Sequence, residues 1–260
     1  MWPDGKKCAM VISFDFDAEE VWLSEHPNNV NRPGVLSQGT YGAKVGVGLI
    51  LDLLKELDLP ATLFVPGRVA ENHPERVTQI VAAGHELGHH GYTHTSPVKL
   101  SAAEEEAELI KGREVLESFG AKVVGYRSPS WEVTPHTFDL LTKYGFEYSS
   151  SMMDDITIYR HANHPIVELP VHWILDDAPH FWFDSGATWN KTIRTPEEVE
   201  QLWQGEFTGI RELGGMIMLT MHPQIIGRPG RLAMLKRFLT WAKSHDDVWF
   251  AQAQEVAKRV

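Results

Sequence analysis

Short apolar runs alternate with amphipathic helical patterns along most of the chain, and this alternation constrains the fold more than any other feature. Between the runs, apolar residues recur every three or four positions, as in residues 45–57. Buried strands are predicted at residues 8–12, 61–65, 86–88, 123–126, 216–221 and 248–250. Regular alternation of strands and helices is typical of an α/β fold built on a mostly parallel sheet.

Helix starts are marked by capping residues. The capping box Ser101–Glu104 predicts a helix that ends near Gly120, and Thr134-Pro135 and Thr195-Pro196 each combine an N-cap with proline at the first helical position. Residues 21–41 are rich in proline, glycine and asparagine without a clear period, so we expect a long functional loop there.

An alternation of this length suits either a closed barrel or an open doubly wound sheet. Six polar side chains follow predicted strands that are spread along the chain, and barrel enzymes gather their active sites from many strand ends in this way. These residues are Asp15, Asp17, His90, His94, Arg127 and His222. We therefore expect an irregular (β/α) barrel of about seven strands, with residues 1–260 forming a single catalytic domain.

Charge and composition exclude several classes of protein. The hydrophobic fraction of 43% is ordinary for a globular chain, and a net charge of -11 argues against nucleic acid as a partner. The single cysteine, Cys8, lies in an apolar run and is expected to be buried. Neither a signal-peptide pattern nor a membrane span is visible, so we expect a cytoplasmic protein without membrane partners.

Four histidines fall within residues 84–94, a density typical of metal sites. One interpretation takes His85, Glu86 and His89 as the HExxH motif of a zinc protease, which must lie on a helix. Three glycines interrupt this segment and argue against a helix. The other interpretation uses His90 and His94, with Asp17 as a third ligand, for one divalent cation, most simply zinc, that keeps a position open for water.

Four ordered motifs resemble those of the polysaccharide deacetylase (NodB-homology) family, in the branch with peptidoglycan-deacetylase-like, allantoinase-like and cyclic-imide-hydrolase-like proteins. They are SFDFD at residues 13–17, ELGHHGYTH at 86–94, YRSPSW at 126–131 and LTMHP at 219–223. The resemblance implies that Asp15 is the general base, that Arg127 orients it, and that His222 is the general acid. It also implies Asp17, His90 and His94 as metal ligands.

The sequence departs from the family pattern near the substrate. Phe16 separates two aspartates that typical members have side by side, and Ser130 precedes Trp131 where an aromatic residue usually follows the proline directly. Trp131, Trp173 and Asp176, the last with its neighbour Asp177, are candidates to shape the substrate pocket.

The resemblance implies hydrolysis of a non-peptide carbon–nitrogen bond. The expected reaction is N-deacetylation of an N-acetylated sugar or a peptidoglycan-type polysaccharide, and ring opening of a small cyclic amide is the alternative. The expected partner is a small molecule or an oligosaccharide, and a homo-oligomer is compatible with the sequence. A rival class, a sugar-binding barrel without catalysis, is disfavoured because base, ligands, arginine and acid are all present.

Overall fold

Buried strands and surrounding helices alternate in the computed structural model, which describes residues 2–183 and 192–260. The strands within these ranges are β1 (Cys8–Asp15), β2 (Thr62–Val65), β3 (Glu86–His89), β4 (Gly125–Tyr126), β5 (Tyr148–Ser149), β6 (Tyr159–Arg160), β7 (Val167–Glu168), β8 (Met216–Met221) and β9 (Val248–Phe250). The helices are α1 (Glu20–Glu25), α2 (Pro33–Tyr41), α3 (Val47–Leu57), α4 (Gly67–Asn72), α5 (Pro74–Ala82), α6 (Ala102–Glu117), α7 (Thr137–Lys143), α8 (Ala178–Phe181), α9 (Pro196–Leu213), α10 (Pro223–Ile226), α11 (Pro229–Lys243) and α12 (Ala253–Ala257).

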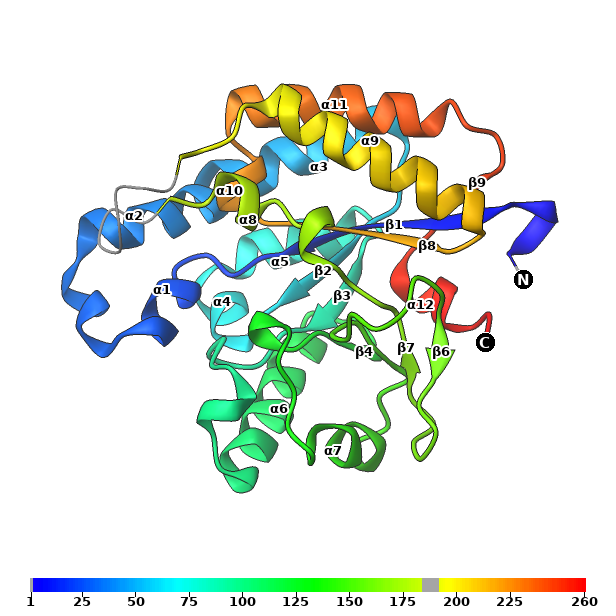
Figure 1. Ribbon diagram of the computed structural model, residues 1–260. Coiled ribbons are helices and arrows are strands. Elements are labelled where there is room, and N and C mark those ends of the chain that lie inside the picture. The colour runs from blue at the N-terminus through cyan, green and yellow to red at the C-terminus, as the bar shows by residue number, and fades with distance from the viewer. Residues whose placement is uncertain (1, 184–191) are drawn as a thin grey trace.

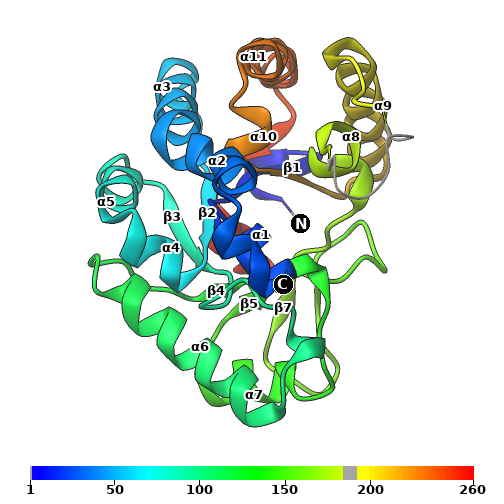
Figure 2. The same ribbon diagram turned by 90° about the vertical axis from the view of Figure 1, so that its left-hand side faces the viewer.

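The strands form one curved sheet in the order β6-β7-β5-β4-β3-β2-β1-β8, with β9 paired to the first residues of β1. The only antiparallel pair among the described strands is β6 with β7. A single bridge between Asp176 and Thr220 joins the segment after β7 to β8, across the open side of the sheet. Helices surround the strands in the end view (Figure 2). The expected irregular (β/α) barrel is therefore confirmed.

The helices cover the outer face of the sheet with apolar side chains. Every residue of β1 is buried, and Trp203 of α9 packs edge-on against Phe238 of α11 with ring centroids 5.6 Å apart. Cys8 lies fully buried in this core, as expected, and burial raises the pKa of its thiol to about 11.

Several helix boundaries match the capping residues. Ser101 forms the predicted capping box at the start of α6. Thr195 is the N-cap of α9, as predicted, and it also forms a capping box with Glu198. The prediction at Thr134 was wrong, because α7 begins three residues later, at Thr137. The Thr134 hydroxyl bonds to Glu105 and the Thr134 amide to the Thr137 hydroxyl, so this residue forms a turn before the helix.

The loop expected at residues 21–41 was also wrong, because this segment contains α1, a 3-10 turn (Pro27–Asn31) and α2. Its prolines stand at helix starts, where the missing N–H costs nothing. Gly39 lets α2 approach the chain after β1, since a Cβ there would lie 2.3 Å from the Ala18 carbonyl oxygen. In Figures 1 and 2, α1 and α2 cross the end of the barrel at which the parallel strands finish.

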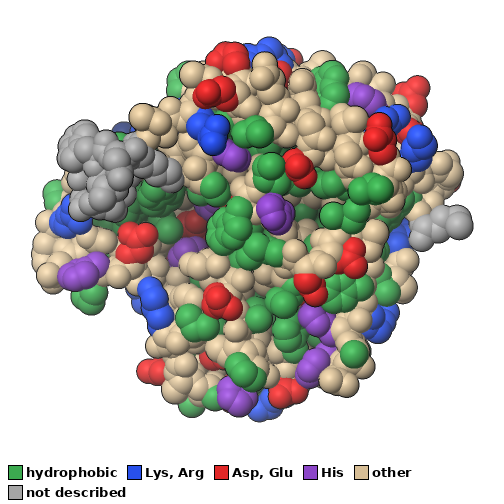
Figure 3. All heavy atoms as spheres, viewed as in Figure 1, with side chains coloured by type: hydrophobic (Ala, Val, Ile, Leu, Met, Phe, Trp, Pro, Cys, Tyr) green, Lys and Arg blue, Asp and Glu red, His purple; other side chains and the backbone are tan. Residues whose placement is uncertain are grey.

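No helix within residues 2–183 and 192–260 combines the length and apolar character needed to cross a bilayer. Acidic and basic side chains are interspersed over the face drawn in Figure 3.

Candidate active site

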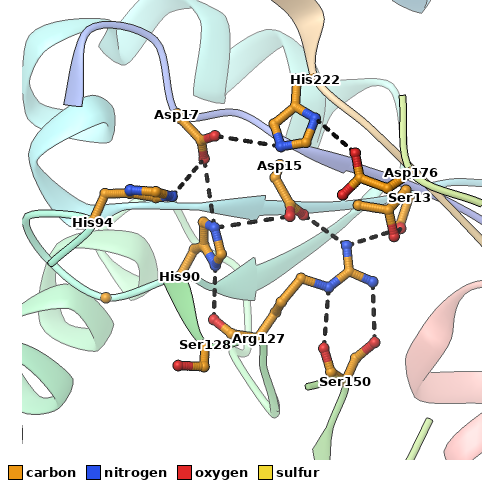
Figure 4. Close-up of polar contacts among 12 residues, drawn as sticks. Ser13, Asp15, Asp17, His90, His94, Arg127, Ser128, Ser150, Asp176 and His222 are labelled. Atoms are coloured by element: carbon orange, nitrogen blue, oxygen red, sulfur yellow. Dashed lines mark hydrogen bonds and ion pairs between the residues drawn. The ribbon is translucent and has the colours of Figure 1, made fainter. Parts of the chain in front are cut away.

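The six polar residues singled out at strand ends converge on one pocket (Figure 4). Asp15 is the last residue of β1, and His90, Arg127 and His222 directly follow β3, β4 and β8. Because these strands are parallel, their carboxyl ends meet at the same end of the barrel. Asp17 and His94 lie in the turns beyond β1 and β3 and complete the group.

Asp17, His90 and His94 form a candidate metal centre. Asp17 Oδ1 lies 3.5 Å from Nε2 of His90 and 3.7 Å from Nε2 of His94, and one ligand atom from each residue lies within 4.8 Å of the others. Neither oxygen of Asp17 has a hydrogen-bond partner among the described residues, although the side chain is fully buried. An isolated buried carboxylate is strongly disfavoured unless a cation compensates it. This donor set therefore fits a divalent ion.

Burial also prepares the imidazoles to act as ligands. It lowers the pKa of both His90 and His94, which favours the neutral ring that a metal requires. Nδ1 of His90 lies 2.7 Å from the Arg127 carbonyl oxygen, and Nδ1 of His94 lies 3.4 Å from the Ser24 hydroxyl. Donation from Nδ1 to these oxygens leaves each Nε2 free to face Asp17. Ser24 could not be anticipated, because its segment was expected to be a loop.

Arg127 fixes Asp15 from below the pocket. The fully buried guanidinium donates to Asp15 Oδ1 at 2.7 Å and to the Ser13 hydroxyl at 3.0 Å, and it also bonds Ser150. Its central carbon lies 4.1 Å from the centre of the Phe64 ring. Burial opposes ionisation of Asp15, but the charge and hydrogen bond of Arg127, together with His90 and His222, outweigh it and lower the pKa of this carboxyl. Asp15 is thus held as a carboxylate beside the candidate metal centre.

His222 is held on the other side of Asp17 by a pair of aspartates. Its Nδ1 lies 2.6 Å from Asp177 Oδ1, and its backbone N–H donates to Asp177 Oδ2 at 3.0 Å. Asp176 Oδ1 lies 3.8 Å from the same Nδ1, while Nε2 lies 3.7 Å from Asp17 Oδ2. Burial disfavours the imidazolium, but Asp177 and Asp176 outweigh it and raise the pKa of His222 well above its usual value. Burial raises the pKa of Asp176 to about 7.

The pocket above these groups is a cavity of about 200 Å³ with aromatic walls. Trp131, Trp173 and Asp176, the three residues expected to shape it, all line it. The two indoles contact each other with centroids 4.3 Å apart, and Trp173 remains 43% exposed. Acidic and histidine side chains are recessed between hydrophobic ones at the left of Figure 3.

Two features of this pocket were missed from the sequence. Trp182 lines the cavity and stacks on Trp22 of α1 at 4.8 Å, an arrangement that joins segments 160 residues apart and leaves no local pattern. Ser130 and Trp131 have φ angles of 60° and 53°, a left-handed conformation that is costly for residues other than glycine and clusters at functional sites.

The protease interpretation is contradicted by the secondary structure. Glu86 and His89 lie on strand β3, so they cannot occupy successive turns of a helix. Glu86 instead accepts hydrogen bonds from Tyr148 and Thr62 at the opposite end of the strand from His90. The His89 ring is buried, and burial lowers its pKa to about 3.

Comparison with known proteins finds relatives over the whole chain. The sequence model of the family described as polysaccharide deacetylase matches residues 41–149. A peptidoglycan deacetylase of Helicobacter pylori is 31% identical over 97% of this chain and 96% of its own length. A solved structure of a putative polysaccharide deacetylase from Mycobacterium smegmatis is 42% identical, with a TM-score of 0.97 over 100% of this chain and 92% of that one.

The fold is shared more widely. An allantoinase structure superposes with a TM-score of 0.86 over 99% of this chain and 91% of that one, at 24% identity. This likeness concerns the fold alone.

Proposed function

The chain belongs to the polysaccharide deacetylase family, and from this premise we propose that it is a metal-dependent hydrolase that removes the acetyl group from an N-acetylated sugar. The observation that carries the proposal is the buried, unpartnered carboxylate of Asp17, which faces two imidazoles. Asp15 and His222, each held by its own charged partner, line the same cavity. We further propose that residues 1–260 act as one catalytic domain.

Asp17, His90 and His94 would hold the ion, and two imidazoles with one carboxylate favour zinc. When bound, a divalent ion would polarise the substrate carbonyl and acidify the attacking water. The three protein ligands leave room for both at an open site.

Asp15 is proposed as the general base. Arg127 occupies Oδ1, while Oδ2 lies on the side of His90 and lines the cavity, 3.8 Å from His90 Nε2. This second oxygen would take a proton from water as the water attacks the acetyl carbon. Arg127 is proposed to keep the carboxylate ionised and correctly oriented, since its planar fork is bonded on several sides.

His222 is proposed as the general acid. A carboxylate can only accept, so the short contact to Asp177 assigns a proton to Nδ1 of His222. The opposite nitrogen, Nε2, faces Asp17 and the cavity. A proton on Nε2 would pass to the sugar nitrogen as its bond to the acetyl carbon breaks. Asp177 would stabilise the imidazolium before this transfer.

The substrate is proposed to be an oligosaccharide end or a small acetylated sugar. Trp131 and Trp173 present aromatic faces on which the apolar face of a sugar ring can pack, and Asp176 offers an acceptor for a hydroxyl group.

The small free volume, about 200 Å³, favours a second candidate, the ring opening of a cyclic amide. A compact planar ring would fill a cavity of this size between aromatic walls. The same base and acid would serve both reactions, because each breaks a bond between a carbonyl carbon and nitrogen.

A substrate panel tests the proposal. Zinc-loaded protein is incubated with N-acetylated chitooligosaccharides, allantoin and succinimide, with Asp15→Asn as the inactive control. We expect acetate release from the oligosaccharides by the wild type alone. Turnover confined to the ring substrates would replace the first candidate by the second. No turnover on any substrate would contradict the hydrolase and favour a sugar-binding barrel.

A further inference from the structure

The turn that carries His90 and His94 has a conformation that must be stabilised by contacts with other segments. Gly91 and His94 have φ angles of 75° and 54°, both in the left-handed region. For glycine this conformation is free of strain, but for histidine it costs about 1 kcal/mol. The turn also leaves the strand ladder, so the N–H and C=O groups between the two histidines must find partners elsewhere.

Helix α6 supplies partners for the N–H groups. Glu108 Oε2 accepts from the backbone N–H of Tyr92 at 2.8 Å and from that of Thr93 at 2.7 Å. Its other oxygen, Oε1, accepts from the Thr93 hydroxyl at 2.8 Å. One carboxylate thus binds three donors that lie between the two imidazoles.

Helix α4 supplies partners for the carbonyl groups of the same turn. The N–H groups of Gly67 and Arg68 donate to the carbonyl oxygens of Gly91 and Tyr92, at 3.0 and 2.9 Å. Glu108 and the start of α4 together bond the N–H and C=O groups of the two peptide units that link Gly91, Tyr92 and Thr93.

The backbone of α6 also contacts the start of the turn. The Leu109 carbonyl oxygen lies 3.0 Å from His89 Nε2, and His89 Nδ1 accepts from the Gly91 N–H at 3.1 Å. Gly112, one helical turn further, allows this approach, because a Cβ there would lie 2.8 Å from the Gly91 oxygen and 2.5 Å from His89 Nε2. The helix therefore meets the turn at three successive points.

We propose that Glu108 is a positioning residue for the metal centre: by binding Tyr92 and Thr93 it sets the separation of His90 and His94. This inference rests on the proposed function, since it concerns the affinity of the same centre. Groups that orient metal ligands without touching the ion typically contribute 10-fold to 100-fold to metal affinity.

Two substitutions at Glu108 distinguish an effect on the orientation of the metal ligands from an effect on folding. Glu108→Ala removes all three hydrogen bonds. Glu108→Gln restores them in principle, because its amide oxygen can accept both N–H groups while its amide nitrogen donates to the Thr93 hydroxyl. Glu114→Ala is the matched control, since Glu114 is exposed on the same helix.

Zinc and cobalt affinities of the folded apo-proteins are measured by competition with a chelator, together with the unfolding temperature of each apo-protein. We expect Glu108→Ala to bind either metal about 10-fold to 100-fold more weakly, Glu108→Gln to recover most of that loss, and the control to match the wild type. A lower unfolding temperature with unchanged affinity would overturn the proposal in favour of a purely structural role.

Two further results keep the test decisive. If Glu108→Ala does not fold, Thr93→Val decides, because it removes the hydroxyl that donates to Glu108 Oε1, and wild-type metal affinity in this variant would overturn the proposal. A wild type that binds neither metal would instead contradict the proposed metal centre. This result is distinguishable from failure of the Glu108 proposal, because it is observed in the wild type and requires no variant.

Discussion

Asp15 and Asp17 are two residues apart and face the same pocket, yet their surroundings indicate different roles. Asp15 is bonded to Arg127, whereas both oxygens of Asp17 lack hydrogen-bond partners among the described residues. We expect Asp15→Asn to retain the metal while turnover falls about 100-fold to 10,000-fold, the usual contribution of general acid–base catalysis. Asp17→Asn should lose both. Elemental analysis and acetate release decide, and metal loss confined to Asp15→Asn would exchange the two roles.

His222 and Asp177 are predicted to act on the leaving group. His222→Ala should slow hydrolysis of an amide about 100-fold to 10,000-fold but cost less with an aryl acetate ester, whose leaving group departs without a proton. Asp177→Asn should also slow the amide more than the ester, though by less, because it removes the negative charge beside Nδ1 while an amide oxygen can still accept from it. Rates on both substrates are compared at equal metal content. Equal losses on amide and ester would mean that His222 positions substrate instead of donating a proton.

The residues missed at this site share a physical reason. The strand-end histidines and aspartates are close to one another in short motifs, so their spacing predicts a common site. Ser24, Trp182 and Glu108 reach the site only because segments distant in the sequence pack against it. The sequence contains no local signal for such contacts, although the pair Asp176-Asp177 was identified as belonging to the pocket.

Helices α2 and α3 are joined by the π-helical turn Gly42–Gly46. Together they pack against the segments that follow β1 and β8. A Cβ at Gly46 would lie 2.3 Å from the Pro223 carbonyl oxygen, next to His222, whereas one at Gly48 would meet only Arg76 Nη1 at 3.5 Å. The regular spacing of apolar residues predicted α3. The π-helical turn could not be predicted in this way, because it depends on backbone packing against the segment after β8, which leaves no periodic pattern in the sequence.

Substitution of these two glycines should change stability in opposite directions. We expect Gly46→Ala to lower the free energy of unfolding by about 1–3 kcal/mol through overpacking. Gly48→Ala should raise it by about 0.5–1 kcal/mol, because alanine is favoured over glycine in a helix interior. Denaturant unfolding of both variants provides the comparison. Stabilisation by both would show that the helix is free to move away from Pro223.

Strand β3 and helix α12 meet at Glu86, far from the candidate metal centre. The carboxyl group accepts from Tyr148, Thr62 and the Gln254 N–H, and burial raises its pKa from 4.5 to about 7. Between these values the folded state binds more protons than the unfolded state. The free energy of unfolding should therefore fall as the pH rises from 4.5 to 7, by about 3 kcal/mol.

The substitution Glu86→Gln isolates this contribution. An amide at this position can keep the three hydrogen bonds but does not titrate. The difference in unfolding free energy between wild type and variant, measured on metal-free protein, should change by about 3 kcal/mol over this range of pH. A constant difference would mean that the three donors hold Glu86 ionised throughout.

For the whole molecule, strand and helix alternation predicted the irregular barrel, and the polar strand ends predicted which end carries the site. The two-residue strands β5, β6 and β7 are too short to show a period, so the strand count was underestimated. Residues 21–41 were misinterpreted because their prolines stand at helix starts and Gly39 allows close packing, whereas both residue types were interpreted as signs of a loop. Those helices cross the end of the barrel where the pocket lies.

Hydrolysis is expected to require one ion held by Asp17, His90 and His94. The most direct measurement titrates zinc into chelator-treated protein while acetate release from an N-acetylated oligosaccharide is followed. We expect a rate that rises in proportion to zinc up to about one equivalent per chain and then stays constant, and no rise in His90→Ala. An undiminished rate before zinc is added, or the same titration curve in His90→Ala, would contradict the requirement for this ion.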